Sequence, residues 1–141
     1  MAKILFVDDE NRRAQLYLDE LLQSGHDTVL KTETDEALTY LQQNQDIDVL
    51  ILDIMMPPGI KFAGKTEQGL DTGVVLYDEI RRIAPRLPVI VLTNVSDREV
   101  AQKFRNENNC WYYPKSDVLP FELAEDIREI LAEPQRQHSQ D

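Results

Sequence analysis

Three runs of four consecutive apolar residues constrain the fold of this chain more than any other feature: ILFV (4–7), VLIL (49–52) and VIVL (89–92). None of them alternates between apolar and polar residues, so each predicts a strand that is covered on both faces. Two weaker strands are expected at TVLK (28–31) and CWYY (110–113). Strands covered on both faces need helices packed against each side of their sheet.

Helical periodicity fills the gaps between these strands. Gly25 and Pro85 mark the ends of the first and third helices, and Ser96 and Glu99 have the spacing of a capping box before the fourth. Apolar residues recur at helical spacing in five segments: 14–22, 37–41, 76–83, 100–104 and 119–131. The strand–helix unit therefore repeats five times, which predicts one parallel sheet with helices on both faces.

The 141 residues suffice for a single domain with a sizeable core, which we assign to residues 1–132. Residues 133–141, EPQRQHSQD, form a polar C-terminal tail. The connection over residues 58–73 contains four glycines and is longer than the usual loop of about two to six residues. We expect this extended loop to act as a flap or docking element, because it leaves the strand beside Asp53.

The charge balance excludes several classes of partner. With 26 acidic and 15 basic residues the net charge is −11, which argues against binding nucleic acid through its phosphates and against an anionic membrane. No apolar run reaches the length of a membrane span, and the N-terminus lacks a signal-peptide pattern. The single cysteine, Cys110, cannot form an internal disulfide. We expect a cytoplasmic protein.

The polar residues that follow the strands predict the position of a functional site. In open parallel sheets, ligands bind beyond the carboxyl ends of the strands. The residues that follow the strands are Asp8, Asp9 and Glu10 after the first run, Asp53 after the second, Thr93 and Asn94 after the third, and Pro114 and Lys115 after CWYY. Among them, three carboxylates, a hydroxyl and an ammonium are therefore expected to converge at one edge.

This set of side chains favours phosphoryl chemistry. Clustered carboxylates repel one another unless a cation relieves them, and oxygen ligands with open positions suit Mg²⁺. A remaining carboxylate can attack phosphorus and form an aspartyl phosphate. Lys115 would neutralise the phosphoryl oxygens, while Thr93 would donate one hydrogen bond. Positioning and electrostatics would then do most of the catalytic work.

Four motifs resemble the signature of response-regulator receiver domains of two-component signalling: FVDDE, LDIMMP, VLT and YYPK. Each motif alone is common, but the four occur in order over residues 2–132 and in register with the five strand–helix units. The chain is similar to a stand-alone, CheY-like member with an extended loop after the phosphoacceptor strand. The resemblance implies a flavodoxin-like (βα)5 doubly wound sandwich with a five-stranded parallel sheet of order 2-1-3-4-5.

The resemblance also implies a role for the acidic residues. Asp53 would be the phosphoacceptor. Asp8, Asp9 and Asp53 would hold Mg²⁺ or Mn²⁺ together with the backbone carbonyl of Met55. The phosphoryl group would come from a histidine kinase or a histidine phosphotransfer protein.

Thr93 and Lys115 would contact the phosphoryl group, by the same resemblance. Tyr112, three residues before the lysine, would swing inward as Thr93 moves, so that Thr93 and Tyr112 form the switch. This movement would alter the face made by the fourth helix, the fifth strand and the fifth helix. That face is the usual output surface for a downstream protein partner and could also support a homodimer.

The sequence departs from the family pattern at two positions beside the site. Ser116 follows the lysine where most members have a proline, often in a cis bond. A cis bond before a residue other than proline costs roughly 3 kcal/mol, so we expect a trans bond or a strained turn. Asn94 replaces a small residue, which we expect to narrow access to Asp53 and slow phosphoryl exchange.

Three hypotheses for function follow. The first is a phosphoacceptor that assists its own phosphorylation and dephosphorylation, is not a turnover enzyme, and signals through protein contact without binding nucleic acid or membrane. The alternative is a receiver-fold interaction module that acts independently of phosphorylation, which Ser116, Asn94 and the long loop motivate. A hydrolase of the haloacid-dehalogenase type is disfavoured, because its second acid is needed where Met55 stands.

Overall fold

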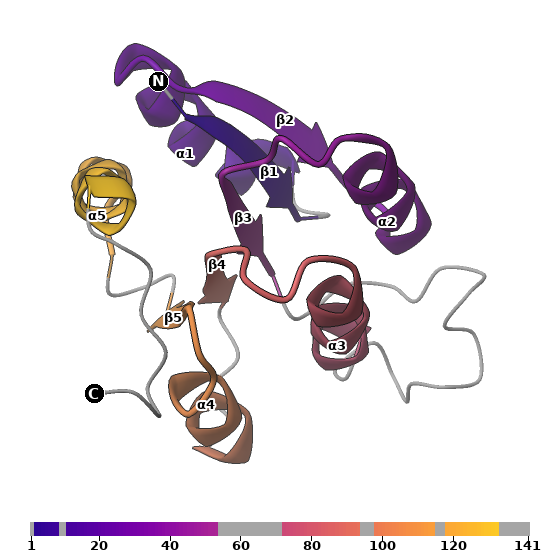
Figure 1. Ribbon diagram of the computed structural model, residues 1–141. Coiled ribbons are helices and arrows are strands. Elements are labelled where there is room, and N and C mark those ends of the chain that lie inside the picture. The colour runs from indigo at the N-terminus through magenta and orange to yellow at the C-terminus, as the bar shows by residue number, and fades with distance from the viewer. Residues whose placement is uncertain (1, 9–10, 54–71, 94–97, 115–117, 133–141) are drawn as a thin grey trace.

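The computed structural model of the chain describes residues 2–8, 11–53, 72–93, 98–114 and 118–132. Within these residues, five strands alternate with five helices (Figure 1). The strands are β1 (Lys3–Val7), β2 (Asp27–Lys31), β3 (Val49–Leu52), β4 (Val89–Thr93) and β5 (Cys110–Pro114). The helices are α1 (Asn11–Gln23), α2 (Thr34–Gln43), α3 (Thr72–Ile83), α4 (Arg98–Arg105) and α5 (Pro120–Ala132). Each predicted strand and helix is therefore present.

The five strands form one parallel sheet in the order β2-β1-β3-β4-β5, which confirms the predicted flavodoxin-like arrangement (Figure 1). From β1 the chain crosses to β2 on one side and then to β3 on the other. The strand order reverses at this point, between β1 and β3. In doubly wound sheets the ligand crevice lies beyond the carboxyl ends of the strands at such a reversal.

The apolar runs are buried because their side chains alternate between two cores. One core lies between the sheet and α2, α3 and α4, and the other lies between the sheet and α1 and α5 (Figure 1). In β3, Leu50 and Leu52 point into the first core, whereas Val49 and Ile51 point into the second. Both faces of the central strands are thus covered, which explains why the runs contain no polar residue.

Two helix ends are fixed by hydrogen bonds. Gly25 has a positive φ of 91°, and its N–H donates to the carbonyl of Leu22 at 3.0 Å, which ends α1 where the sequence predicts. At the start of α5, the N–H of Leu119 donates to Glu122 Oε1 at 2.9 Å. This second contact is half of a capping box, which the sequence analysis did not single out.

Several predictions lie outside the described residues. Residues 72 and 73 of the predicted 58–73 loop belong to α3, and residues 58–71 are outside the described part. The tail at 133–141 and the predicted cap at Ser96 are also outside it. The division into a domain over residues 1–132 and a tail stays a prediction.

Candidate functional site

Asp8 and Asp53 stand side by side at the carboxyl edge of the sheet. Asp8 follows β1 and Asp53 follows β3, and the two strands align Val7 with Leu52. The N–H of Asp53 donates to the carbonyl of Val7 at 2.9 Å, and the N–H of Asp8 donates to the carbonyl of Lys31 at 3.1 Å. These bonds extend the strand ladders by one residue. The two carboxylates therefore start from neighbouring backbone positions, about 5 Å apart as in any pair of adjacent strands.

Both carboxylates are withdrawn from solvent. The exposed fraction is 0% for Asp8 and 3% for Asp53, and they are the only acidic residues among the described ones that are buried. Burying a charge costs free energy unless hydrogen bonds or an opposite charge compensate it, and a neighbouring like charge adds to that cost. Two carboxylates buried on adjacent strands mark this edge as a candidate functional site.

The backbone of Thr93 reaches the same edge. Thr93 is the last residue of β4, which lies beside β3, and it aligns with Pro114 at the end of β5. Its side chain is outside the described part of the structure. The same holds for the other predicted site residues, whose roles stay predictions: Asp9, Met55, Asn94, Lys115 and Ser116.

Tyr112 lies on β5, two residues before the end of β5, and is aligned with Val91 of β4. Its half-buried ring packs against Phe104 of α4, with 6.5 Å between ring centroids and 11° between ring planes. The guanidinium carbon of Arg105 lies 5.4 Å from the centroid of the Tyr112 ring. Phe104 belongs to the apolar segment 100–104 that the sequence predicts as helical, but no local pattern links an exposed helix residue such as Arg105 to a later strand.

The donor chemistry of the acidic pair suits a hard cation. Mg²⁺ is usually bound through one or two carboxylates together with phosphate oxygens and water. Asp8 and Asp53 provide two carboxylates at one edge, which fits this requirement. Within the described residues no group of three His, Cys, Asp or Glu side chains forms a candidate metal site. Asp9 and Met55, the remaining predicted ligands, are outside those residues.

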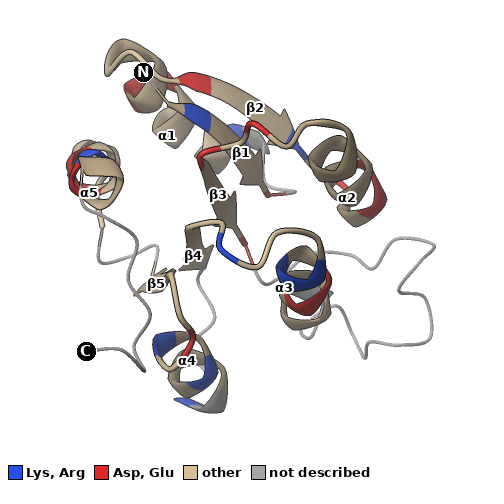
Figure 2. Cartoon of the chain, in the orientation of Figure 1, with Lys and Arg blue, Asp and Glu red and all other residues tan. Residues whose placement is uncertain are grey.

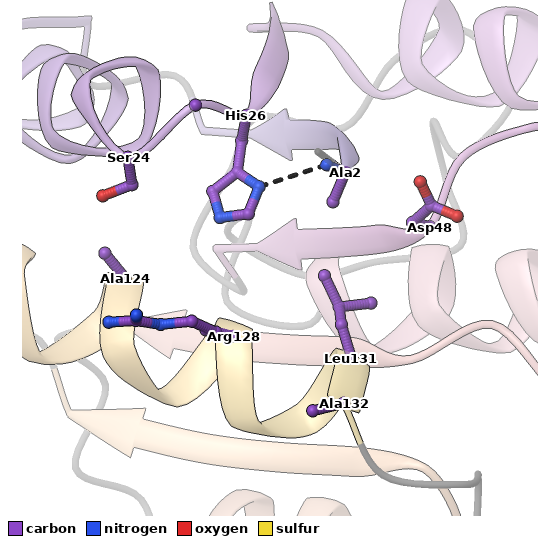
Figure 3. A pocket seen from close by; sticks show the side chains of 9 residues that line it. Ala2, Ser24, His26, Asp48, Ala124, Arg128, Leu131 and Ala132 are labelled. Atoms are coloured by element: carbon purple, nitrogen blue, oxygen red, sulfur yellow. Dashed lines mark hydrogen bonds between the residues drawn. The ribbon is translucent and has the colours of Figure 1, made fainter.

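A separate cavity of about 680 Å³ lies at the opposite, amino edge of the sheet, between the end of α1 and the last turns of α5 (Figure 3). His26 lines it and accepts the N–H of Ala2 at Nδ1, at 3.2 Å. Burial lowers the pKa of His26, and the positive charge of Arg128 contributes to this shift. Neither member of the acidic pair lines this cavity.

Comparison with known proteins relates this geometry to one family. The family model described as the response regulator receiver domain matches residues 4–115. The transcriptional regulatory protein BaeR of Escherichia coli O6:H1 is 29% identical over 98% of this chain and 52% of its own length. CpxR of Escherichia coli K12 is 32% identical over 93% of this chain and 50% of its own length. The chain spans about half the length of these curated relatives.

Solved structures agree with the fold. A CheY-like receiver domain protein from Methanospirillum hungatei superimposes with a TM-score of 0.76 at 22% identity, covering 94% of both chains. The response regulator TrrA of Thermotoga maritima, in complex with Mg²⁺ and BeF, has a TM-score of 0.70 at 27% identity, covering 92% of this chain and 99% of its own. In the described part of the chain, no helix has the length and apolar character needed to cross a membrane.

Proposed function

Because the chain belongs to the response-regulator receiver family, we propose that Asp53 accepts a phosphoryl group in a Mg²⁺-dependent reaction. The observation that carries this proposal is the buried acidic pair, Asp8 and Asp53, held on neighbouring strands at the carboxyl edge. The four residues of β3 are entirely buried, so the strand holds Asp53 in a fixed position. Such positioning lowers the barrier for attack by a weak nucleophile.

In the proposed reaction, a carboxylate oxygen of Asp53 attacks the phosphorus of a phosphohistidine. The new O–P bond forms as the P–N bond breaks, and the departing imidazole takes up a proton from solvent. Asp8 and Asp53 would hold Mg²⁺, which would neutralise charge on the phosphoryl oxygens when bound. Thr93 and Lys115 would contact the same oxygens and fix the orientation of the group. The donor would be a histidine kinase or a histidine phosphotransfer protein.

The phosphorylated protein would act by contact with other proteins rather than by turnover of a substrate. The surface formed by α4, β5 and α5 would change when Asp53 is phosphorylated and would bind the downstream partner or a second copy of the chain. The relatives are named transcriptional regulators, but a net charge of −11 offers no excess of basic groups for DNA phosphates. We therefore propose that the direct contacts of this chain are with proteins. We also propose that it acts in the cytoplasm.

Phosphorylation is tested by incubating the protein with acetyl phosphate and Mg²⁺ and measuring its intact mass. Wild type should gain one phosphoryl group, and chelation of Mg²⁺ should abolish the gain. Asp53→Asn should gain nothing. Asp27→Asn, which removes an exposed carboxylate at the opposite edge of the sheet, should behave as wild type.

Two outcomes would contradict the proposal. Failure of wild-type protein to gain mass under conditions that label a known receiver domain would exclude the phosphoacceptor role. Alternatively, phosphorylation could leave binding to an identified partner unchanged, with Asp53→Asn binding equally well. That second result would favour an interaction module that works without phosphorylation.

A further inference from the structure

Three aromatic rings from three different elements pack in a row, and we call them the aromatic column: Tyr77 of α3, Phe104 of α4 and Tyr112 of β5. Tyr77 and Phe104 meet edge to face, with 5.0 Å between centroids and 89° between planes. Phe104 and Tyr112 are nearly parallel, at 6.5 Å and 11°. The column therefore joins α3 to β5 through a single residue of α4.

Each ring of the column has a cation close to it. Arg81 lies 5.1 Å from the centroid of Tyr77, and Lys103 lies 5.6 Å from Tyr77 and 5.8 Å from Phe104. Arg105 lies 5.4 Å from Tyr112. Figure 2 shows the basic residues that α4 contributes, on a chain whose net charge is −11. Cations at this distance from a ring are attracted by its negative face.

The two ends of the column are held differently. Tyr77 is fully buried, and its hydroxyl accepts a hydrogen bond from Arg81 Nε at 2.8 Å. Arg81 also donates to the carbonyls of Asn108 and Asn109, at 3.0 and 2.9 Å, so this end is fixed to the chain before β5. Tyr112 is only half-buried, with the exposed Arg105 over its ring. The Tyr112 end is therefore the more exposed end of the column.

Few side chains of α4 are buried against the sheet. Among those that the structure describes, only Phe104 is fully buried, and the half-exposed Val100 packs against the same core. An element with so few buried contacts has low local stability, so small changes at Phe104 or Tyr112 shift it easily. A contact that fixes the Tyr112 ring would therefore also bias where α4 lies.

We propose that Arg105 is a positioning residue that acts through Tyr112 and holds its ring against Phe104. Arg105 thereby favours the arrangement of the α4–β5 surface in which these two rings are in contact. This inference rests on the proposed function, because the bias affects signalling only if Asp53 becomes phosphorylated. An exposed cation–π contact changes the ratio of two conformations by about two- to five-fold. Arg105 would thus set how readily phosphorylation rearranges the output surface.

The contact is tested first in unphosphorylated protein, by NMR of tyrosine ring resonances assigned with Tyr112→Phe. Arg105→Gln should shift the Tyr112 resonances away from their wild-type values, while Arg105→Lys, which keeps the cation, should restore most of the wild-type shift. Arg98→Gln removes the same charge from an exposed position on the same helix and should leave Tyr112 unchanged. Unchanged Tyr112 resonances in Arg105→Gln, or equal shifts in both Gln variants, would overturn the proposal.

The second measurement follows the same resonances during titration with beryllofluoride in the presence of Mg²⁺. Arg105→Gln should reach half-saturation at about two- to five-fold lower beryllofluoride than wild type, with Arg98→Gln matching wild type. Equal midpoints for Arg105→Gln and wild type would show that Arg105 does not bias the surface.

The two proposals fail separately. If acetyl phosphate does not label wild type while Arg105→Gln still shifts Tyr112, the phosphoacceptor role is wrong and the ring contact stands. If labelling is normal and the Tyr112 resonances do not respond to Arg105→Gln, the phosphoacceptor role stands and the positioning role of Arg105 is wrong. A thermal melt of each variant by circular dichroism checks that the comparison is made on folded protein.

Discussion

The two edges of the sheet use charge in opposite ways. At the amino edge, charged groups have complementary partners: the N–H of Lys3 donates to Asp48 at 2.9 Å, and its ammonium lies 3.1 Å from Asp46. At the carboxyl edge, Asp8 and Asp53 are two like charges, both buried and on adjacent strands. Pairing opposite charges supports folding, whereas burying like charges together opposes it.

This difference separates the stability of the fold from its chemistry. The amino edge can be optimised for packing and hydrogen bonding, because no reaction is proposed there. The carboxyl edge must keep a reactive carboxylate beside its neighbour, and functional sites commonly sacrifice stability in this way. Variants that alter one edge at a time should therefore have effects of opposite sign on the free energy of unfolding.

The largest loss of stability is expected from Arg81→Ala. The guanidinium donates to Tyr77 and to the carbonyls of Leu87, Asn108 and Asn109, so its removal takes a charged donor away from four acceptors at once. We expect the free energy of unfolding to fall by about 3 kcal/mol, since each charged hydrogen bond contributes roughly 1.5–3 kcal/mol and the effects overlap. Urea denaturation measures this loss.

Arg82→Ala is the matched control for this prediction. Arg82 is the next residue on α3, is exposed, and forms an ion pair with Glu79 three residues earlier. Its loss should change the free energy of unfolding by no more than about 0.5 kcal/mol. Equal losses for the two variants would mean that the amino edge is not stabilised by Arg81 in particular.

Asp8→Asn should change the free energy of unfolding in the opposite direction and stabilise the protein. Replacing one of two adjacent buried carboxylates by a neutral side chain of the same shape relieves repulsion, and we expect a gain of about 2 kcal/mol in Mg²⁺-free buffer. Saturating Mg²⁺ should stabilise wild type and have a much smaller effect on Asp8→Asn. Thermal unfolding with and without chelator measures both effects. A variant less stable than wild type in Mg²⁺-free buffer would show that the pair is not under strain.

The position of Asp8 and Asp53 at the carboxyl edge was predictable from the sequence, and the contacts of Arg81 at the amino edge were not. The runs ILFV and VLIL identify β1 and β3, and the acids that follow them must lie at one edge because parallel strands end together. Arg81 bonds to main-chain carbonyls up to 28 residues later, and any residue can supply such an acceptor. A pattern of side chains cannot reveal a partner that is backbone. The pair of Ala2 and His26 was missed for the same reason.

The thiol of Cys110 at the amino edge should give a smaller effect, on the pH dependence of stability, that reports whether water reaches this edge. Burial raises the pKa of Cys110 to about 12 from an ordinary value of 9.0. The unfolded thiol ionises first as pH rises, so the stabilisation present below pH 9 is lost between about pH 9 and 12, by about 1 kcal/mol at pH 10. Cys110→Ala should flatten this part of the profile measured by urea denaturation. An unchanged slope would place the thiol in contact with water.

The smallest effect on the free energy of unfolding is expected from His26, which lines the amino-edge cavity. Burial lowers its pKa below the ordinary value of 6.5, so the unfolded chain binds the proton more readily than the folded chain. The stabilisation is therefore present above pH 6.5 and is lost as pH falls through the folded pKa, because Nδ1 must then give up the N–H of Ala2. His26→Gln should lose this acid-side slope while keeping the wild-type response to Mg²⁺. If the variant lost its Mg²⁺ response as well, the two edges would be coupled, and the division between a stabilising edge and a reactive edge would be wrong.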